Sequence, residues 1–483
     1  MAAESNGRAR SSFRDPAGSL HVVRGRVFRT VSPQAAIILD EFLGAPGARA
    51  LVESGKLIST RAVQEDEAPA SELGVQAAED SNGRPHIFEH ERVWFPSYAY
   101  EWPVEMLYAA GQLTLDLATA TLKQGFGLKD ATPFNVLFRG PKPVFVDVLS
   151  FEKRESSDPR WLPYAQFLRT FVFPLLLAKE FGTGANEIFL ANPGGLEPEQ
   201  VYRRLNWLRR IRPPFLTVAA IPTWLNKSVT PDDKELYKTA HSSSPEKAQF
   251  ILEMRFRAAR KLLARGRPAS DRKSVWSSYL DDLSYSSDEF KEKSQAVSRW
   301  MQDVKPATVL DIGCNTGHFS EIAAKTGARV VGVDLDPVVV GRTWQRATSG
   351  NLDILPLVVN LARPSPAVGW RNAEYPSFLA RATGAFDAVI MLAVLHHLLV
   401  TERIPLPEIM DVAAELANKA LIIEYVSKDD PMFQRLTRGR EALHADFTQE
   451  VFEAECQRRF TIAEKLPVKG ELRWLYLLRK NGG

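Results

Sequence analysis

The chain has 483 residues, 45% of them hydrophobic and 25% charged, which is the composition of a soluble globular protein with more than one hydrophobic core. Its 61 basic and 58 acidic side chains leave a net charge of +3, which gives no indication of a polyanionic partner. The two cysteines, Cys314 and Cys456, exclude a disulfide framework or a cysteine-based zinc site and favour a cytoplasmic protein. No apolar run is long enough to span a bilayer, and residues 1–15 lack the apolar segment of a secretory signal.

Changes of composition along the chain predict four segments. Residues 1–20 are rich in Ser, Arg, Ala and Gly, which is typical of a disordered lead-in. Residues 21–200 are expected to form an N-terminal module, residues 201–295 a basic helical connector, and residues 296–483 a C-terminal domain. In the connector, the run RRLNWLRRIR fits two interpretations: a solvated helix face beside an apolar stripe, or a surface that binds RNA or another anionic substrate.

The N-terminal module mixes strand and helix patterns. Residues 21–32 alternate in hydrophobicity around Gly25, which predicts a hairpin. Residues 64–84 are acidic, small and polar, as surface loops are. From Val104 onward, apolar or small side chains recur at helical spacing, so a helix is expected that ends near Gly125 or two residues later.

The run LKDATPFNVLFRGPKPVFVDVLSFE places three polar side chains, Asp130, Asn135 and Asp147, around a predicted short hairpin. Carboxylate and amide oxygens on a rigid hairpin are ligands that suit Mg²⁺. The spacing resembles the catalytic loop of the protein-kinase and aminoglycoside-phosphotransferase superfamily. This resemblance implies an α+β kinase-like domain that binds ATP, in which Asp130 is the base and Asn135 and Asp147 are metal ligands.

Departures from the kinase pattern leave several interpretations of the module open. No G-x-G-x-x-G loop precedes the run, and VDVLS stands in place of Asp-Phe-Gly. A nucleotide-pairing lysine can be assigned only by guess, to Lys56. The three polar side chains would also serve simply to cap turns. The module is therefore an active kinase, a degenerate kinase-like module that recognises a substrate or partner, or a fold with capped turns.

From residue 307 onward, apolar strand patterns alternate with helical patterns as far as ALIIEYV. Such alternation predicts an α/β fold, a doubly wound Rossmann-like parallel sheet with helices on both faces. The runs RFTIAEKLPV and RWLYLLRK follow around a short turn. They predict an antiparallel hairpin that completes a seven-stranded sheet.

The first strand of this sheet leads into the turn DIGCNTG. In a doubly wound sheet, ligands bind beyond the carboxyl ends of the strands, where this turn lies. Gly313 lets the backbone turn tightly, Gly317 lets the next helix pack closely, and Asn315 between them tolerates a left-handed conformation. Asp311 and Asp334, at the ends of the first two strands, repel a pyrophosphate but suit ribose hydroxyls and a cationic ligand.

This pattern resembles motif I of class I S-adenosylmethionine-dependent methyltransferases, in which a hydrophobic strand and an acid precede G-x-G-x-G. The resemblance extends from about Trp300 to the C-terminus, and Asn315 departs from the motif. It implies that Asp334 binds the ribose and that Asn360, after the third strand, reads the adenine. The alternatives are a nicotinamide-type turn or a structural one. The predicted cofactor-binding residues are Asp311, Gly313, Asn315, Gly317, Asp334 and Asn360.

Methyl transfer requires alignment of the two reactants and, for a hydroxyl acceptor, a base. His396 and His397, at the end of the fourth strand, are candidates, and because neighbouring residues point apart we expect at most one to face the ligand. Glu424, at the end of the fifth strand, is the other candidate. Alternatively the histidines cap the strand and Glu424 is a surface or supporting acid. The turn-rich residues 363–378 fit a substrate lid or a long loop.

These patterns predict a cytoplasmic S-adenosylmethionine-dependent methyltransferase whose kinase-like N-terminal module is used in substrate recognition. The methyl acceptor is unidentified, with a small molecule or glycan favoured over RNA. One rival is a bifunctional enzyme similar to the kinase–methyltransferases that cap bacterial O-antigen glycans, with reversed domain order. An RNA methyltransferase and a non-catalytic binding scaffold are the others. The sequence does not define the oligomeric state.

Overall fold

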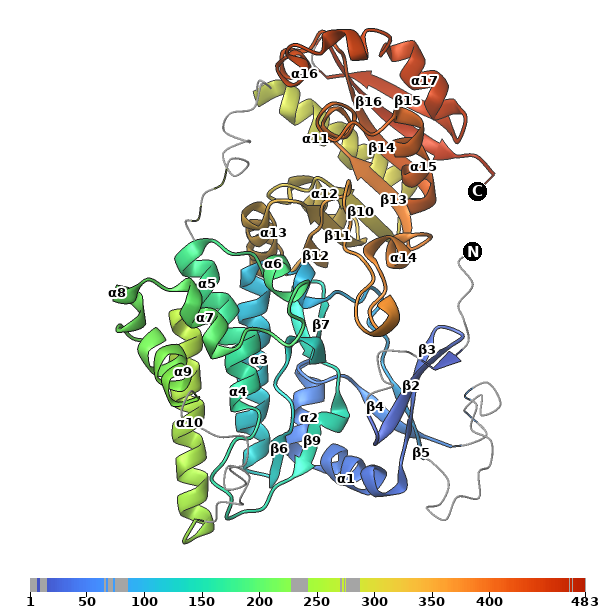
Figure 1. The fold of residues 1–483 in the computed structure, drawn as a ribbon. Helices are drawn as coiled ribbons and strands as arrows, with labels where there is room; N and C mark the ends of the chain where they lie inside the picture. Colours follow the sequence, from blue (N-terminus) through green and yellow to red (C-terminus); the bar gives the residue numbers. More distant parts are fainter. Residues whose placement is uncertain are drawn as a thin grey trace.

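A computed structural model describes residues 7–8, 15–64, 67, 73, 86–226, 242–269, 272, 274, 287–468, 470 and 472–482 of the chain. Figure 1 shows an N-terminal part, coloured blue to yellow-green, below a C-terminal part, coloured yellow to red. Most of the predicted surface loop 64–84 and of the predicted lead-in 1–20 lies outside the described residues.

The N-terminal part begins with an antiparallel sheet of five strands in the order β1-β2-β3-β5-β4. The predicted hairpin is confirmed: Arg24 and Gly25 have φ of 49° and 75°, the positive values that a tight two-residue turn needs. Strand β1 and the first three residues of β2 lie within the segment predicted to be disordered, because such short pieces of strand leave no periodic signal in the sequence. The strands are β1 (Gly7–Arg8), β2 (Gly18–Val23), β3 (Arg26–Val31), β4 (Thr60–Val63) and β5 (His86–His90).

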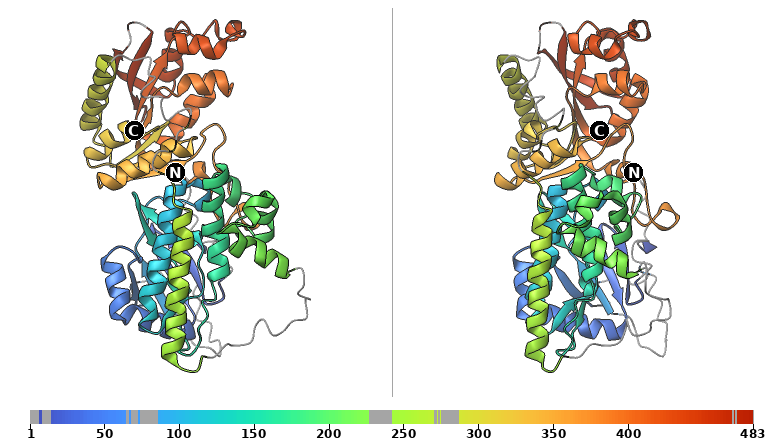
Figure 2. Two further views of the ribbon diagram at one scale, coloured as in Figure 1. Left: turned by 90° about the vertical axis from the view of Figure 1, so that its left-hand side faces the viewer. Right: turned by 60° about the vertical axis from the view of Figure 1, so that its left-hand side comes forward.

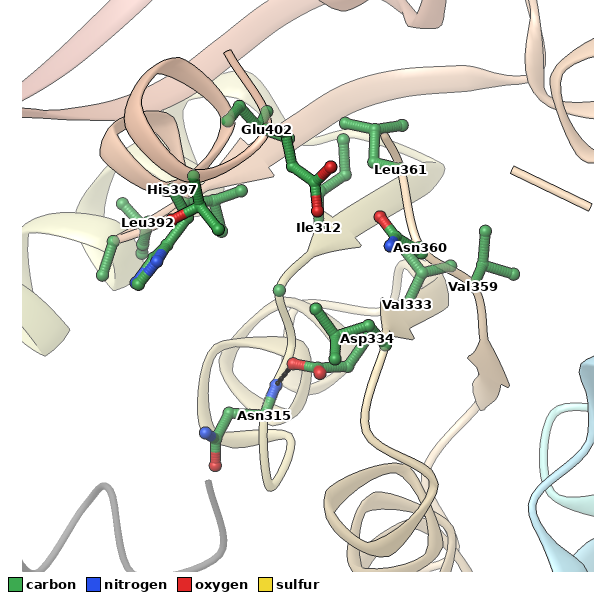
Figure 3. A pocket seen from close by; sticks show the side chains of 16 residues that line it. Ile312, Asn315, Val333, Asp334, Val359, Asn360, Leu361, Leu392, His397 and Glu402 are labelled. Atoms are coloured by element: carbon green, nitrogen blue, oxygen red, sulfur yellow. Dashed lines mark hydrogen bonds between the residues drawn. The ribbon is translucent and has the colours of Figure 1, made fainter. Parts of the chain in front are cut away.

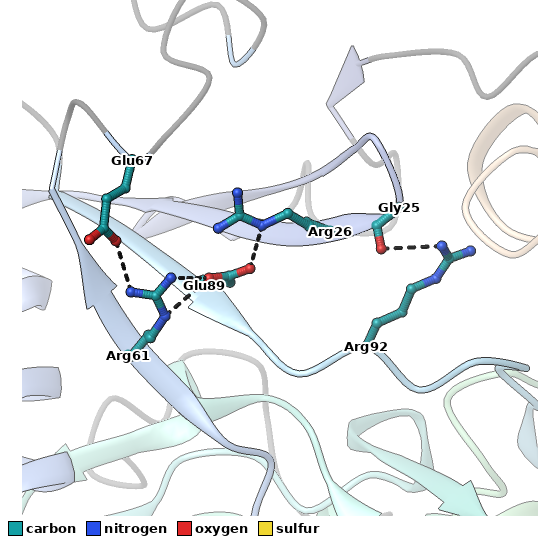
Figure 4. A network of polar contacts seen from close by, with 6 residues as sticks. All are labelled: Gly25, Arg26, Arg61, Glu67, Glu89 and Arg92. Carbon is teal, nitrogen blue, oxygen red and sulfur yellow. Dashed lines mark hydrogen bonds and ion pairs between the residues drawn. The ribbon is translucent and has the colours of Figure 1, made fainter.

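Exposed ion pairs link three strands of this sheet (Figure 4). Arg26 of β3 and Arg61 of β4 both bind Glu89 of β5, at 2.6 and 2.7 Å. Hydrogen bonding to Arg26 holds the pKa of Glu89 below its usual value. Arg61 also contacts Glu67 at 2.9 Å, and Arg92 donates to the Gly25 carbonyl at 3.2 Å. Since the arginines are exposed, these contacts favour strand register more than stability.

A long helix, α3 (Val104–Leu122), forms the centre of the N-terminal part, and it ends close to the predicted glycine. Its buried side chains form a core with the helices that connect β3 to β4. The hairpin predicted after α3 is present, with Val136 paired to Phe145. The remaining elements here are α1 (Pro33–Gly44), α2 (Pro46–Glu53), η2 (Ala99–Glu101), β6 (Phe126–Leu128), η3 (Pro133–Asn135), β7 (Val136–Arg139), β8 (Lys142–Phe145), η4 (Val148–Ser150) and β9 (Phe151–Lys153).

The predicted connector contains a helix, α10 (Pro245–Arg265), that packs along α3 in both views of Figure 2. A Cβ on Gly111 of α3 would lie 3.0 Å from Leu263 of α10, so the glycine permits the close approach. This helix belongs to the N-terminal core. The boundaries predicted for the connector, residues 201 and 295, stay a prediction. Before it come α4 (Tyr164–Phe167), η5 (Leu168–Val172), α5 (Phe173–Phe181), α6 (Ala185–Phe189), α7 (Pro198–Arg204), α8 (Trp207–Arg210), η6 (Leu216–Ala220) and α9 (Ile221–Asn226).

The C-terminal part contains a seven-stranded sheet in the order β12-β11-β10-β13-β14-β16-β15. The first five strands in this order are parallel, and β16 pairs antiparallel with both β14 and β15, so the predicted terminal hairpin is confirmed. Every residue of β10 is buried, as expected for a central parallel strand. The strands are β10 (Thr308–Ile312), β11 (Arg329–Asp334), β12 (Ile354–Val358), β13 (Phe386–Met391), β14 (Ala417–Val426), β15 (Phe460–Pro467) and β16 (Arg473–Lys480).

Helices cover both faces of this sheet. Trp300 of α11 and Val309 of β10 share one hydrophobic cluster, whereas Leu310 and Met410 of α15 belong to the cluster on the other face. The helices are α11 (Ser287–Val304), α12 (His318–Lys325), α13 (Pro337–Ser349), η8 (Trp370–Asn372), α14 (Phe378–Ala382), η9 (His397–Thr401), α15 (Leu406–Leu416), α16 (Pro431–Thr437), η10 (Glu441–His444) and α17 (Gln449–Gln457).

The two parts share a continuous hydrophobic core. Phe95 of the N-terminal part packs against Phe386 of β13, with ring centroids 5.5 Å apart. Arg381 of α14 forms a buried ion pair with Glu101, and it donates to the Pro96 carbonyl at 2.6 Å. A buried pair of this kind fixes the geometry of the contact. The N-terminal part is therefore positioned directly against the sheet.

Candidate functional site

A pocket lies at the carboxyl ends of β10, β11, β12 and β13 (Figure 3). Its empty volume is about 930 Å³, including open solvent, which is within the range of small-ligand sites. We refer to it as the strand-end pocket. Predicted residues in its lining are Gly313, Asn315, Asp334, Asn360 and His397. Lining residues that the sequence did not reveal include Leu392, Val394 and Glu402.

The turn after β10 has the backbone geometry that was predicted. Gly313, Asn315 and Gly317 have φ of 73°, 48° and 81°. A Cβ on Gly313 would lie 2.3 Å from Val394, and one on Gly317 would lie 2.7 Å from Thr343. Larger residues are therefore excluded at both glycines, while Asn315 adopts the left-handed conformation that asparagine tolerates. The turn brings backbone groups against one wall of the pocket.

Asp334, at the end of β11, is a half-buried carboxylate that has no cationic partner among the described residues. Its two oxygens accept hydrogen bonds from the backbone N–H groups of Asn315, at 3.1 Å, and Asp336, at 3.0 Å. No lysine, arginine or histidine in the described ranges lies within ion-pair distance of it. Burial raises the pKa of Asp334 to about 6. Each oxygen keeps lone pairs that a ligand hydroxyl can use.

Asn360 follows β12 on the same side of the pocket as Asp334 (Figure 3). Its amide oxygen accepts a hydrogen bond from the Ala362 N–H at 2.9 Å. The amide nitrogen is therefore the atom that can donate to a ligand.

Asp311 is not among the residues that line the pocket, and its predicted role in cofactor binding stays a prediction. Side chains alternate along a strand, so Asp311 points away from the face of Ile312 and toward α12. There it accepts a hydrogen bond from Ser320 at 2.6 Å. Burial raises its pKa to about 6. Gly317 also lies outside the lining, at the beginning of α12.

The two histidines follow β13 after a left-handed residue, Ala393, with φ of 55°. His397 lines the pocket and His396 does not, which agrees with the expectation that one at most would face the ligand. Burial lowers the pKa of both, so both imidazoles are neutral near pH 7. His396 is 1% exposed, and neither of its ring nitrogens has a hydrogen-bond partner among the described residues. The rings lie 4.3 Å apart.

Glu424 lies outside the pocket, within a buried ion-pair network. Lys293 of α11 contacts it at 2.5 Å and Arg473 of β16 at 3.6 Å. Arg473 also binds Asp430 at 2.8 Å. The structure therefore favours the supporting role over the catalytic one for Glu424. Lys293 was missed, although it lies one helical turn before Val297 on the apolar face of α11.

The turn-rich residues 363–378 pack on the N-terminal part. Tyr375 contacts Tyr98 and Phe134, with ring centroids 5.0 Å apart in both pairs. Phe134 lies between two of the predicted kinase-like residues. The segment thus links the edge of the strand-end pocket with the loop that follows β6.

A second polar cluster, the Asp147 cluster, consists of Arg29, Asn135, Asp147 and Ser150. Arg29 of β3 binds one oxygen of Asp147 at 2.9 Å, and Ser150 donates to the other at 2.6 Å. The amide nitrogen of Asn135 donates to Ser150 at 3.0 Å. The predicted metal ligands thus come together, but a guanidinium already neutralises Asp147.

Two further candidates from the N-terminal part, Asp130 and Lys56, do not belong to the Asp147 cluster. Asp130 accepts a hydrogen bond from Gln166 at 3.3 Å. Lys56 pairs with Asp116 at 3.1 Å, so the guess that it binds a nucleotide finds no support in its position. Across the described ranges, no three His, Cys, Asp or Glu side chains converge as a metal site requires.

Comparison with known proteins decides the family. A model of a methyltransferase domain matches residues 285–462. The nodulation protein NoeA of Rhizobium meliloti (strain 1021) is 30% identical over 486 residues, which cover 99% of this chain and 98% of that protein. The chain belongs to the NoeA family. It is a class I S-adenosylmethionine-dependent methyltransferase.

Two further relatives match parts of this NoeA-family methyltransferase. The O-antigen chain terminator bifunctional methyltransferase/kinase WbdD of Escherichia coli is 28% identical over 132 residues, 27% of this chain and 16% of that protein. The crystal structure of the N-methyltransferase NodS from Bradyrhizobium japonicum WM9 is 19% identical, with a TM-score of 0.30, and the match covers 40% of this chain and 97% of NodS.

The strand-end pocket of this NoeA-family methyltransferase fits S-adenosylmethionine. Asp334 offers acceptors for which no cation in the described part of the chain competes, and the glycine turn leaves room for a ligand against the backbone. Leu392 and Val359 supply apolar walls. No helix within the described ranges has both the length and the apolar content to cross a membrane.

Proposed function

We propose that this enzyme methylates a hydroxyl group of a glycan or another small polar acceptor, and that its N-terminal part binds that acceptor. One observation carries the proposal: a neutral imidazole, His397, lies across the strand end at Ile312 from Asp334 and Asn360 (Figure 3). Methyl transfer to oxygen needs a base on one side of the reacting atoms and groups that bind a nucleoside on the other.

On the cofactor side, the proposed roles follow the lining of the pocket. Asp334 accepts hydrogen bonds from the ribose hydroxyls, and Asn360 donates to the adenine. The backbone from Gly313 to Asn315 lies against the methionine portion. Asp311 acts indirectly, since its bond to Ser320 fixes the start of α12 beneath the turn.

On the acceptor side, bound S-adenosylmethionine supplies an electrophilic methyl group. His397 takes the proton of the acceptor hydroxyl, and its lowered pKa keeps the ring in the unprotonated form that can do so at neutral pH. Leu392 and Leu398 line the same pocket, and their apolar side chains exclude water from it.

A glycan is favoured over other acceptors by the relatives. WbdD acts at the end of O-antigen chains, as its name states, although it matches only 27% of this chain. The packing of Tyr375 on Phe134 supports a shared acceptor site, because it joins the pocket edge to the N-terminal part. In this proposal the module spans about residues 21–200, with α10 packed on it, and the methyltransferase domain starts near residue 296.

The N-terminal part is proposed to recognise the acceptor without phosphorylating it. Arg29 occupies the Asp147 carboxylate at 2.9 Å, so Mg²⁺ would have to displace a guanidinium. The alternative, a kinase and methyltransferase in one chain, draws on the convergence of Asn135 and Asp147 near Ser150.

The test measures S-adenosylhomocysteine formation by the full chain with a panel of bacterial oligosaccharides, and with RNA in parallel. His397→Ala should lower kcat about 100-fold or more while S-adenosylmethionine still binds, since general base catalysis contributes that much. His396→Ala is the matched control and should retain turnover. Turnover on RNA alone, or undiminished turnover by His397→Ala, would contradict the proposal.

Calorimetry with Mg²⁺ and ATP separates the two roles of the N-terminal part. ATP hydrolysis or phosphoryl transfer that Asp147→Ala abolishes would replace the recognition role with the bifunctional one. Loss of acceptor binding in Phe134→Ala, with S-adenosylmethionine binding intact, is the result expected for a recognition module.

A further inference from the structure

Exposed apolar side chains gather on one side of the N-terminal part. In the described ranges, half of the large apolar residues that are exposed lie between Phe181 and Leu225. Trp207 and Leu225 are 68% and 61% exposed. Soluble surfaces rarely concentrate such residues without a partner. We define the apolar patch as the six residues from α8, α9 and the turn between them: Trp207, Leu208, Ile211, Ile221, Trp224 and Leu225.

Arginines flank the apolar patch along the chain, in α7, in α8 and directly after α8. Arg203, Arg204 and Arg212 are exposed, so their charges face solvent beside it. Arg209 contacts Glu180 at 3.3 Å and lies over the ring of Phe181. We call these arginines, together with Arg210, the arginine rim.

Contacts with Tyr202 and with the buried helix η6 support part of the apolar patch. Trp224 donates its indole N–H to the Tyr202 hydroxyl at 3.2 Å, and Arg210 stacks on the same ring at 4.1 Å from its centroid. Val218 and Ala219 of η6 are buried in the core below. Thr223 of α9 is buried too, whereas α8 has no buried residue, so the apolar patch is joined to the core through α9 and η6.

We infer that the apolar patch and the arginine rim dock on a membrane surface that contains anionic lipids. Tryptophan and aliphatic side chains flanked by arginine are the composition of peripheral membrane-binding helices. The arginines match the negative headgroups, and the apolar side chains enter the headgroup region.

RNA is the less suitable occupant of the apolar patch. Leu208, Ile211 and Leu225 offer neither hydrogen bonds nor stacking planes to bases. A helix of four residues, such as α8, also cannot enter a groove.

The location of the surface is compatible with catalysis. In Figures 1 and 2, α8 and α9 project from the side of the N-terminal part, away from the sheet that carries the strand-end pocket. Docking there leaves the pocket open to its cofactor.

The test is co-sedimentation of the full chain with vesicles. Phosphatidylcholine vesicles are compared with vesicles of equal parts phosphatidylcholine and phosphatidylglycerol, at low and high salt. We expect binding to the anionic vesicles that weakens with salt. Trp207→Ser combined with Leu225→Ser should reduce it more than about tenfold, and Arg203→Gln combined with Arg204→Gln at least about fivefold.

Matched controls lie elsewhere on the surface. Ile37→Ser removes an apolar side chain that is 67% exposed, and Arg458→Gln removes an arginine whose side chain is 67% exposed. Both should bind vesicles as the unaltered chain does, and all variants should retain S-adenosylmethionine binding, which reports folding. Absence of binding to anionic vesicles, equal binding by the Trp207→Ser and Leu225→Ser variant, or binding of single-stranded RNA without vesicle binding would overturn the inference.

Discussion

The strand-end pocket and the Asp147 cluster both gather carboxylates that were predicted to bind a ligand, yet their electrostatics differ. In the pocket, the described residues give Asp334 hydrogen bonds from backbone N–H groups and no cation within ion-pair distance. In the cluster, Asp147 is paired with Arg29 at 2.9 Å. A carboxylate that stays unpaired despite burial is held ready for a ligand, whereas a paired one has its interaction within the fold.

The pKa of Asp334 is consistent with its having no cationic partner in the described ranges. Burial raises the pKa of Asp334 to about 6, which is the mark of a carboxylate that folding has desolvated without a counter-charge. Glu424 belongs on the paired side of the comparison, although it lies in the methyltransferase domain. It is fully buried between Lys293 and Arg473. Whether a carboxylate is paired with a cation therefore does not depend on the domain in which it lies.

The largest expected effect is a loss of stability on substitution of Glu424, the more deeply buried of the paired carboxylates. Glu424→Gln keeps the side-chain volume but removes the carboxylate charge that Lys293 contacts at 2.5 Å. Loss of one partner of a buried pair costs about 3–5 kcal/mol, and urea unfolding should show that decrease in the free energy of unfolding. Glu415→Gln, on the exposed face of α15, is the control and should change it little. If Glu424→Gln stopped turnover with no loss of stability, Glu424 would be catalytic after all.

The next effect concerns the unpaired carboxylate. Asp334→Asn should weaken S-adenosylmethionine binding about a hundredfold, because hydrogen bonds to a charged group contribute about 1.5–3 kcal/mol each. Asp147→Asn, the matched change at the paired site, should leave that affinity within about twofold. Isothermal titration of both variants checks this. An equal loss in the two variants would remove the contrast between the sites.

Much of the methyltransferase domain could be predicted from the sequence because its signals are local. Buried parallel strands such as β10 appear as short apolar runs, and Gly313 and Asn315 mark a turn that only a few residue types can form. The position of Asn360 follows from strand order alone.

Long-range pairings could not be predicted. Lys293 and Glu424 are 131 residues apart, and Arg29 and Asp147 are 118 apart, so no periodicity connects them. The side-chain direction of Asp311 was not predicted, because its place at the end of the strand was considered without the alternation that turns it away from the face of Ile312. The pocket wall at Glu402 depends on how the segment after β13 folds, which composition does not encode.

The pH dependence of Asp334 provides a third, smaller effect. Its folded pKa of about 6 lies above the ordinary value of about 3.9, so acidification below pH 6 protonates the folded protein first. The cost of burying the charge is present above about pH 6 and disappears as the pH falls toward 3.9, so this group makes the ligand-free protein more stable on acidification.

Cofactor binding should change in the opposite direction. A protonated carboxyl loses acceptor capacity, so S-adenosylmethionine affinity should fall about tenfold one pH unit below the pKa of Asp334. Titrations at pH 7.5 and 5 measure it, with Asp334→Asn as a variant that should lack this dependence. Affinity that stays constant in the unaltered chain would mean that Asp334 remains ionised or does not bind the ribose.

The smallest effect tests the paired site itself. Arg29→Gln removes the cation from Asp147, and because the pair is partly exposed the loss of stability should be about 1 kcal/mol, measurable by urea unfolding. The same change leaves the Asp147 carboxylate without its counter-charge, as Asp334 is. If pairing is what keeps Asp147 from a metal, Mg²⁺ with ATP should bind this variant more tightly than the unaltered chain. Arg26→Gln, which removes a surface arginine from the same strand, is the control. Equal metal affinity in all three proteins would show that the geometry around Asp147, and not its charge pairing, distinguishes this site from the strand-end pocket.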